Sequence, residues 1–522
     1  MQLLSGTSIK TRVILNRMSA QSILTSVSIA YLILVNVSTR SVSAQTEYDS
    51  LITTARTFSY EAKFHKAEEL FKRATQLSPA RGDGYLGLAQ IHLWLFLGTN
   101  DRSEYDTFNH LCDRSIDVGK KALAEDREDF RADYTLGETY LLRTIAEAMR
   151  HSYLNSFLAI RAAYGYLRQT LKSDPHFYDA YRGIGEIHYY LDMMPGSVKW
   201  ILPITGLFAD RRRGFEEIRL AYLKGTVDKV KSAFSLAQVY SNYVAEYDSA
   251  EILLRGLVKE FPDNPMFNYH LAVVLIKERN LTEAQSYLDG LLNRNDPRFA
   301  LLNNLSLFLE GDVYFKMNDF PSAIKYNLMF LSKSKNPEYK CLADYRLAFS
   351  YRMLGDSALM KKYMIDARNG NHDTYDDSFA AERCKFFLAN GISNDQAIMI
   401  EMGNDLAAGK YDKVYRTLLA LVNGIRDRRV KSEGFITLAD AAIRLGKYAE
   451  GARFARSAAS SGDGVEKWVR ARAWYLIALG SFYTGDRATS RKYLKKVEGT
   501  SQYGKDETLS ALTNNLRRKL GR

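Results

Sequence analysis

The sequence predicts an all-α protein, a right-handed α-solenoid made of stacked helical hairpins. Three observations support this fold class. Small and bulky apolar residues recur at helical spacing, short turns with Gly or Asn separate the periodic segments, and no run of alternating β-branched residues indicates a strand. The chain has 522 residues, of which 46% are hydrophobic. A chain of that length is too long for one compact hydrophobic core. A repeat array can be this long, because each hairpin buries its apolar face against its neighbours.

The first hairpin is predicted between residues 45 and 80. In each of its two helices, apolar residues recur every three or four positions and therefore share a face. These residues are Leu51, Ala55 and Phe58 in the first helix and Phe64, Ala67, Phe71 and Ala74 in the second. The small residues let the two helices approach closely, the aromatic residue fills the gap toward the next hairpin, and Pro79 stops the helix.

This order of residues resembles the tetratricopeptide repeat. The resemblance implies helix pairs whose first members line a concave side, and a binding function rather than catalysis. Two later hairpins agree in register, because Ala250 in "AEYDSAEILL" and Ala284 in "RNLTEAQSYL" are 34 residues apart, the length of this repeat. Turns such as "KMNDFPSAIKY", "AAGKYDKVYRTL" and "RLGKYAEGARFA" indicate further hairpins.

The chain divides into five predicted segments. Residues 1–44 are a signal peptide or membrane anchor, and 45–191 are N-terminal hairpins with an insertion. Residues 192–225 are an irregular apolar connection rich in Pro and Gly. Residues 226–370 form a central array of hairpins, and 371–522 form a C-terminal array.

The first 44 residues have the features of an export signal. They contain Lys10, Arg12 and Arg17, no acidic residue, and the apolar run "ILTSVSIAYLILVNV" before "SVSAQ", where Ala44 suits a processing site. Three interpretations are open: a cleaved signal peptide, an uncleaved membrane anchor, and a transit peptide rich in Arg and Ser. We expect an exported protein that is periplasmic, secreted or associated with the envelope.

The segment 192–225 interrupts the repeats, because Pro195, Gly196, Pro203 and Gly206 break an apolar run. It is either a packed connection between two sub-arrays or an apolar lip that meets a partner or a membrane surface. The residues of this lip would be Trp200, Phe208, Arg211, Arg212 and Arg213.

Residues 130–370 carry a second resemblance. The Pro-broken loop with Gly206 and Phe208, the step from Asp210 to Arg211, and Gly214 before an amphipathic helix are similar to the eukaryotic tetratricopeptide-repeat-39 and inclusion-body-clearance family. That family is a non-enzymatic helical-repeat group linked to lipid and protein-deposit handling, so the resemblance implies an adaptor. The export-type leader departs from the family.

No pattern in the sequence predicts an enzyme, a cofactor or a metal site. The spacing of "GDGYLG" matches a dinucleotide fingerprint, but a helix rather than a strand precedes it. The eight histidines are dispersed, and Cys112, Cys341 and Cys384 are too scattered for zinc. The sequence leaves undecided whether Cys341 and Cys384 form a disulfide bond in an oxidising compartment.

The net charge is mildly positive. The first 44 residues hold four of the 72 basic residues and none of the 60 acidic ones, so residues 45–522 have a net charge of +8. Acidic residues are interleaved with the basic ones along most of the chain, which is typical of solvated helix faces. We therefore expect no nucleic-acid partner.

The function that the sequence favours is an exported, non-enzymatic scaffold that binds a protein or peptide on its concave face. Helical phase places a set of polar and aromatic side chains there. They are Tyr85, Gln90, Tyr181, Glu186, Asn268, Asp344 and Arg352. Two alternatives are a membrane-peripheral, lipid-associated adaptor and a carbohydrate- or nutrient-binding receptor on the same scaffold, which the 34 tyrosines would suit. The oligomeric state is left open.

Overall fold

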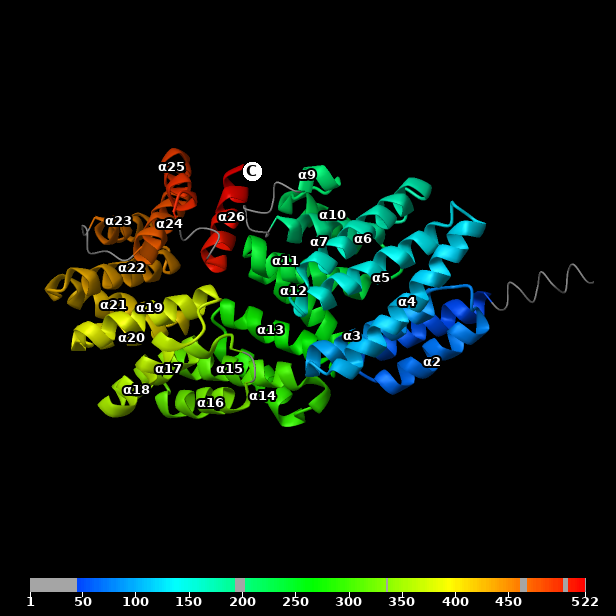
Figure 1. Cartoon of the computed structure of the whole chain (residues 1–522). Helices are drawn as coiled ribbons and strands as arrows, with labels where there is room; N and C mark the ends of the chain where they lie inside the picture. Colours follow the sequence, from blue (N-terminus) through cyan, green and yellow to red (C-terminus); the bar gives the residue numbers. More distant parts are fainter. Residues whose placement is uncertain (1–44, 193–201, 335–336, 461–466, 501–505, 522) are drawn as a thin grey trace, which may run out of the picture.

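The computed structural model describes residues 45–192, 202–334, 337–460, 467–500 and 506–521. In these ranges the chain folds into α-helices with a few short 3₁₀ and π turns, and no β-strand occurs among them. The helices stack as successive antiparallel pairs (Figure 1). The prediction of an all-α solenoid of helical hairpins is therefore confirmed.

The helix pairs follow one another along the chain. In the first half they are 45–60 with α2 (Phe64–Leu77), α3 (Asp83–Thr99) with α4 (Arg102–Glu125), α5 (Phe130–Met149) with α6 (Tyr153–Ser173), α7 (Ala180–Leu191) with α10 (Arg211–Lys224), and α11 (Lys229–Val239) with α12 (Tyr247–Glu260). The short α9 (Leu202–Thr205) precedes α10, and the π turn η1 (Tyr240–Val244) extends α11.

The second half continues the same arrangement. Its pairs are α13 (Pro265–Lys277) with α14 (Leu281–Arg294), α15 (Ala300–Lys316) with α16 (Phe320–Lys333), α17 (Lys340–Met353) with α18 (Ser357–Asn369), α20 (Asn394–Ala407) with α21 (Tyr411–Leu421), α22 (Arg428–Arg444) with α23 (Tyr448–Ala459), and α24 (Lys467–Tyr483) with α25 (Arg487–Glu498). Two 3₁₀ turns, η2 (Pro297–Phe299) and η3 (Val422–Gly424), precede α15 and follow α21. The helix α19 (Tyr375–Asn390) packs on α17 and α18, and α26 (Glu507–Gly521) is last.

Small residues set the distance between neighbouring helices. Ala67, Phe71 and Ala74 of α2 are buried, and the Phe71 ring lies against Gly87 of α3. A Cβ atom added at Gly87 would lie 2.3 Å from a carbon of that ring. The interlock of small and aromatic residues predicted for the first hairpin is therefore present.

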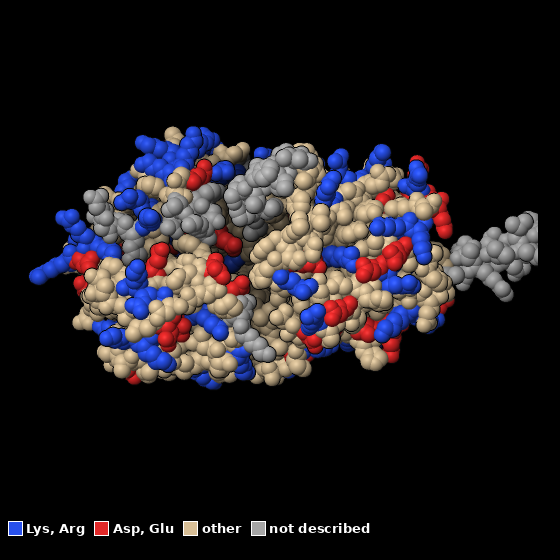
Figure 2. Space-filling model, in the orientation of Figure 1, with Lys and Arg blue, Asp and Glu red and all other residues tan. Residues whose placement is uncertain are grey.

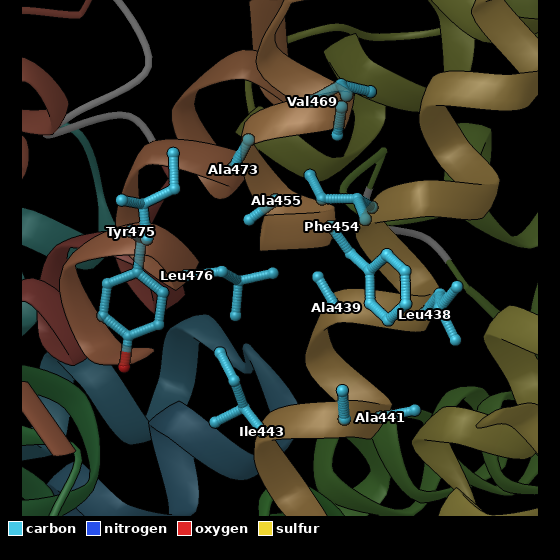
Figure 3. Close-up of a cluster of buried hydrophobic side chains, with 14 of the residues drawn as sticks. Leu438, Ala439, Ala441, Ile443, Phe454, Ala455, Val469, Ala473, Tyr475 and Leu476 are labelled. Atoms are coloured by element: carbon cyan, nitrogen blue, oxygen red, sulfur yellow. The ribbon is translucent and has the colours of Figure 1, made fainter. Parts of the chain in front are cut away.

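The same packing recurs near the C-terminus. Between α22, α23 and α24, the aromatic ring of Phe454 lies among small residues such as Ala439 and next to Leu438 (Figure 3). Ala455 and Ala473 are fully buried in this cluster. Alternating small and large side chains thus hold hairpins together at both ends of the array.

Part of the predicted irregular connection is a regular helix. Residues 193–201 lie outside the described residues, but α10 begins at Arg211, where Asp210 caps it by accepting a hydrogen bond from the Arg213 backbone N–H. A Cβ atom at Gly185 of α7 would lie 2.6 Å from the Gly214 carbonyl oxygen. The two glycines let α10 pack tightly on α7 as its hairpin partner, so residues 211–224 are not irregular as predicted.

The first hairpin also contacts the middle of the chain. The Tyr60 hydroxyl donates to the Asp228 carboxylate at 2.8 Å, and the Asn264 side chain donates to the Tyr60 carbonyl at 2.8 Å. In addition, the Arg298 guanidinium donates to the Ala62 carbonyl at 2.9 Å. The N-terminal hairpins therefore curve so strongly that the first of them closes against residues 228–298.

The last helix closes a second contact. On one side, Leu509, Leu516 and Leu520 of α26 join the hydrophobic cluster of α22–α25. On the other side, Asn514 donates to the Tyr243 carbonyl at 3.3 Å and Arg518 forms an ion pair with Glu246 at 3.1 Å. Figure 1 shows α26 beside α11, so the C-terminal end of the array returns to its middle.

The three cysteines and the side chain of Glu310 lie in the interior. Cys112, Cys341 and Cys384 are buried and free, so Cys341 and Cys384 are not bridged. Glu310 of α15 is fully buried. Its burial, with the nearby Asp289 carboxylate, raises the pKa of Glu310 to about 8.

We expect Gly87→Ala to lower the free energy of unfolding by about 1–3 kcal/mol, because the new methyl group overlaps the Phe71 ring. Urea denaturation followed by circular dichroism measures the change. The matched control is Gly256→Ala in α12, where an added Cβ meets no atom within 4 Å. That variant should gain about 0.5–1 kcal/mol, since Ala favours helix over Gly. Equal changes in the two variants would contradict the close approach of α2 and α3.

We expect Glu310→Gln to stabilise the protein at pH 8 to 9 and to change little at pH 4. The folded-state pKa of about 8 exceeds the value near 4.5 of the unfolded chain, so stability is lost as the pH rises between these values. The neutral amide removes this loss, which amounts to as much as about 5 kcal/mol. Unfolding curves across this pH range measure it, and parallel pH profiles for the two proteins would disprove the assignment.

Candidate partner-binding surface

The inner face of the first half is filled by its own side chains. Arg182 of α7 forms ion pairs with Glu138 of α5 and, at 2.8 Å, with Glu186. The Ser235 hydroxyl of α11 donates to Glu186 at 2.5 Å. Arg182 and Glu138 are both buried, and a buried ion pair holds its geometry because separating the charges is costly. This part of the concave side therefore leaves little room for a partner.

The inner side from α12 onward differs, because its polar side chains are only partly buried. We call this region the central surface. Its residues lie on or next to α12, α13, α17, α19, α24 and α26, and they are Tyr247, Tyr269, Lys277, Tyr339, Tyr375, Arg472, Asp506 and Glu507. All but one are half-buried, and Glu507 is exposed. Figure 2 shows a furrow down the middle of the molecule with Asp and Glu side chains beside it.

The N-terminal end of α26 brings two carboxylates to this surface. Burial raises the pKa of Tyr375, and the Asp506 carboxylate raises it further. Burial also raises the pKa of Tyr339, and Glu338, Asp376 and Glu507 add to that shift. Side chains from α17, α19 and α26, which are far apart in sequence, thus act on one another electrostatically across the central surface.

Lys277 lies at the C-terminal end of α13. Its ammonium group donates to the Ser241 hydroxyl at 3.0 Å and to the Asn242 side-chain oxygen at 2.9 Å, and it lies 5.9 Å from the centre of the Tyr247 ring. Burial lowers the pKa of Lys277 to about 8, although the Glu507 carboxylate opposes this shift. The charge of the central surface therefore depends on pH just above neutrality.

Three of the residues predicted to contact a partner are engaged in contacts within the array. Asn268 is buried and donates to the Pro262 and Asn264 carbonyls, so it ties α13 to the preceding turn. Asp344 is buried in α17. Glu186 belongs to the internal Arg182 network. These side chains contribute to the packing of the array. Helical phase places a residue on the inner side, but it does not reveal whether that side is already filled.

The other four predicted residues are half-buried but lie apart from the central surface. Tyr85 of α3 stacks with Arg114 of α4 at 5.5 Å. Gln90 lies further along α3, and Tyr181 lies in α7. Arg352 of α17 donates to the Asn394 side chain at 3.1 Å. Their contact with a partner stays a prediction.

The predicted lip is partly described. Trp200 lies outside the described residues, whereas Phe208 is 54% exposed. Arg211 forms an ion pair with Asp192 at 3.0 Å, and Arg213 forms one with Glu217 at 2.8 Å. Arg212 is exposed. The three arginines therefore do not act as one free cluster.

The central surface could not be located from the sequence. None of its eight members was among the predicted residues, because they come together only when α26 returns to the middle of the array. One signal was present: the leucines at 509, 512, 516 and 520 have the spacing of an amphipathic helix. That spacing predicts a helix but not the place where it packs.

The described residues contain neither a metal-binding cluster nor a membrane-spanning helix. No group of His, Cys, Asp or Glu among them is arranged to hold a metal ion. Within the same ranges, no helix combines the length and the apolar character that a membrane-spanning helix requires.

Comparison with known proteins identifies the repeat. Residues 243–298 match the family model of the tetratricopeptide repeat, and this span includes Tyr247 and Lys277 of the central surface. No curated protein matches the chain. The match and the hairpin packing together support a tetratricopeptide-repeat protein.

Three solved structures align over most of the chain, at low similarity. The crystal structure of the yeast Tom70 is 11% identical, with a TM-score of 0.25, and the alignment covers 91% of this chain and 96% of that one. The crystal structure of the P58(IPK) TPR domain is 14% identical, with a TM-score of 0.20 and coverage of 79% and 95%. That of the APC/C hetero-tetramer Cut9-Hcn1 is 12% identical, with a TM-score of 0.28 and coverage of 91% and 90%.

We expect Lys277 to titrate near pH 8, well below an ordinary lysine at about 10.4. Burial penalises its charged form, so the amine loses its proton early. Reductive ¹³C-methylation followed by NMR across pH 6 to 11 measures the shift, and Lys277→Arg identifies the resonance by its disappearance. A Lys277 resonance that titrates together with the exposed lysines would show that the amine is fully hydrated.

Proposed function

We propose that this protein is a non-enzymatic scaffold that binds a segment of a protein or peptide on the central surface. The observation that carries the proposal is the contrast between the two halves of the array. The inner face of the first half is filled by the Arg182 network, whereas the central surface presents half-buried tyrosines that this network does not reach. An inner face that stays partly open is where repeat arrays bind extended partners.

The chemistry of the central surface suits such a partner. Tyrosine provides a large apolar ring with a hydroxyl group, and it is enriched among residues that dominate protein interfaces. Tyr247, Tyr339 and Tyr375 supply the rings, while Lys277, Arg472 and Glu507 supply charges of both signs. A segment with apolar anchors flanked by acidic and basic residues would complement this pattern.

Export and an adaptor role belong to the same proposal. The charge pattern and the apolar run of residues 1–44 support export to the periplasm, the envelope or the medium. The resemblance of residues 130–370 to the tetratricopeptide-repeat-39 and inclusion-body-clearance family supports a non-enzymatic adaptor. A membrane surface is less well supported as the partner, because Arg211 and Arg213 are engaged in ion pairs.

We expect a photo-crosslinking amino acid at Tyr375 to capture the partner in cells, and the same group at Tyr153 to capture none. Tyr153 is the matched control, since it is 68% exposed and lies at the start of α6, outside the central surface. Mass spectrometry of the crosslinked band identifies the partner.

With the purified partner, the contribution of Tyr375 to the binding affinity can be measured. We expect Tyr375→Ala to weaken binding by about tenfold or more, as for a central interface tyrosine, and Tyr153→Ala to leave the affinity unchanged. Isothermal titration calorimetry measures both affinities. Equal crosslinking from the two positions, or equal affinities of the two variants, would place the binding surface elsewhere.

A further inference from the structure

A pocket of ≈ 250 Å³ lies between α6, α7 and α10 and shares no residue with the central surface. Its charged lining residues are Arg168 and Lys172 of α6 and Arg213 and Glu217 of α10. The apolar part of its wall comes from Leu171 and Ile184. Because α6 and α10 are second helices of neighbouring hairpins, the pocket lies over the first helix α7 that they flank.

The charges around this pocket do not cancel. Arg213 Nε lies 2.8 Å from Glu217 Oε1, so these two side chains neutralise each other. Arg168 and Lys172 are one turn apart on α6 and both are exposed. Within the described chain, no carboxylate forms an ion pair with either of them. The pocket therefore keeps an excess of about two positive charges at neutral pH.

A buried chain of hydrogen bonds lies beneath the pocket wall. His188 of α7 is fully buried; its Nδ1 lies 2.5 Å from Glu217 Oε2, and its Nε2 lies 3.2 Å from the Tyr164 hydroxyl. A carboxylate only accepts hydrogen bonds, so Nδ1 donates to Glu217. In that tautomer Nε2 is the acceptor, so the Tyr164 hydroxyl donates its proton to His188, and this bond holds the Tyr164 ring in the pocket wall.

The two basic side chains define the chemistry of the pocket. His188, Glu217 and Tyr164 bond to one another beneath its wall, so Arg168 and Lys172 are the groups left to meet a ligand. Two cations around one small cavity form a site complementary to an oxyanion.

We propose that this pocket binds the phosphate group of a small phosphate monoester. Such a group carries about −1.5 to −2 charges at pH 7, which matches the excess from Arg168 and Lys172. The Arg168 guanidinium can donate two parallel hydrogen bonds to phosphate oxygens, and Lys172 adds a compact charge. Leu171 and Ile184 contact the organic part, and the volume of the pocket limits that part to a small group.

Isothermal titration calorimetry with phenyl phosphate tests the proposal, with phenol as the uncharged comparison. We expect the full chain to bind phenyl phosphate and not phenol. The double variant Arg168→Gln/Lys172→Gln should lose about tenfold or more in affinity, because charged hydrogen bonds to the phosphate are removed. Both residues are exposed, so this variant keeps its fold.

The matched control is Arg161→Gln/Arg219→Gln, which removes the same charge from exposed positions of α6 and α10 outside the pocket. Its affinity should stay within about twofold of the native chain, since remote exposed charges act weakly. Absence of binding, or equal losses in the two double variants, would overturn the site.

Discussion

The close approach of neighbouring helices at small residues is the constraint on which this structure depends. Where Gly87 lies against the Phe71 ring, and where Gly185 and Gly214 bring α7 and α10 together, there is no space for one additional carbon atom. These contacts fix both the spacing of the helices and the rotation of each hairpin on the last. Because the rotations accumulate along the stack, they also decide which distant hairpins meet.

The two halves of the array use this curvature differently. The N-terminal hairpins curve until Tyr60 reaches Asp228, and the space inside them is filled by paired charges such as Arg182 and Glu138. Such buried pairs add little net stability, but they hold one arrangement because any other leaves a charge without its partner. The later hairpins enclose a region that α26 borders and that tyrosines line. The proposed partner-binding surface therefore lies among the later hairpins, whereas paired charges fix the arrangement of the earlier ones.

Local features of the fold could be predicted from the sequence, whereas the long-range closure could not. The alanines at 250 and 284 are buried at equivalent places in α12 and α14, which is the register that their spacing indicates. In contrast, Tyr60 and Asp228 are 168 positions apart, and their contact depends on the summed rotation of the hairpins between them. Helical phase predicted Glu186 on the inner side, but it could not reveal that Glu186 bonds to Arg182 and Ser235. The residues of the central surface could not be predicted either, because they come together only through this long-range closure.

The return of α26 to η1 also limits how this architecture can change through evolution. Open solenoids gain or lose hairpins at little cost, because each unit contacts only its neighbours. Here an additional hairpin anywhere between η1 and α26 would shift the last helix by about 10 Å, the usual distance between packed helices, and Arg518 would no longer reach Glu246. Duplication or deletion of a repeat in this interval would break the loop, so the number of repeats is expected to be held constant among descendants of this chain.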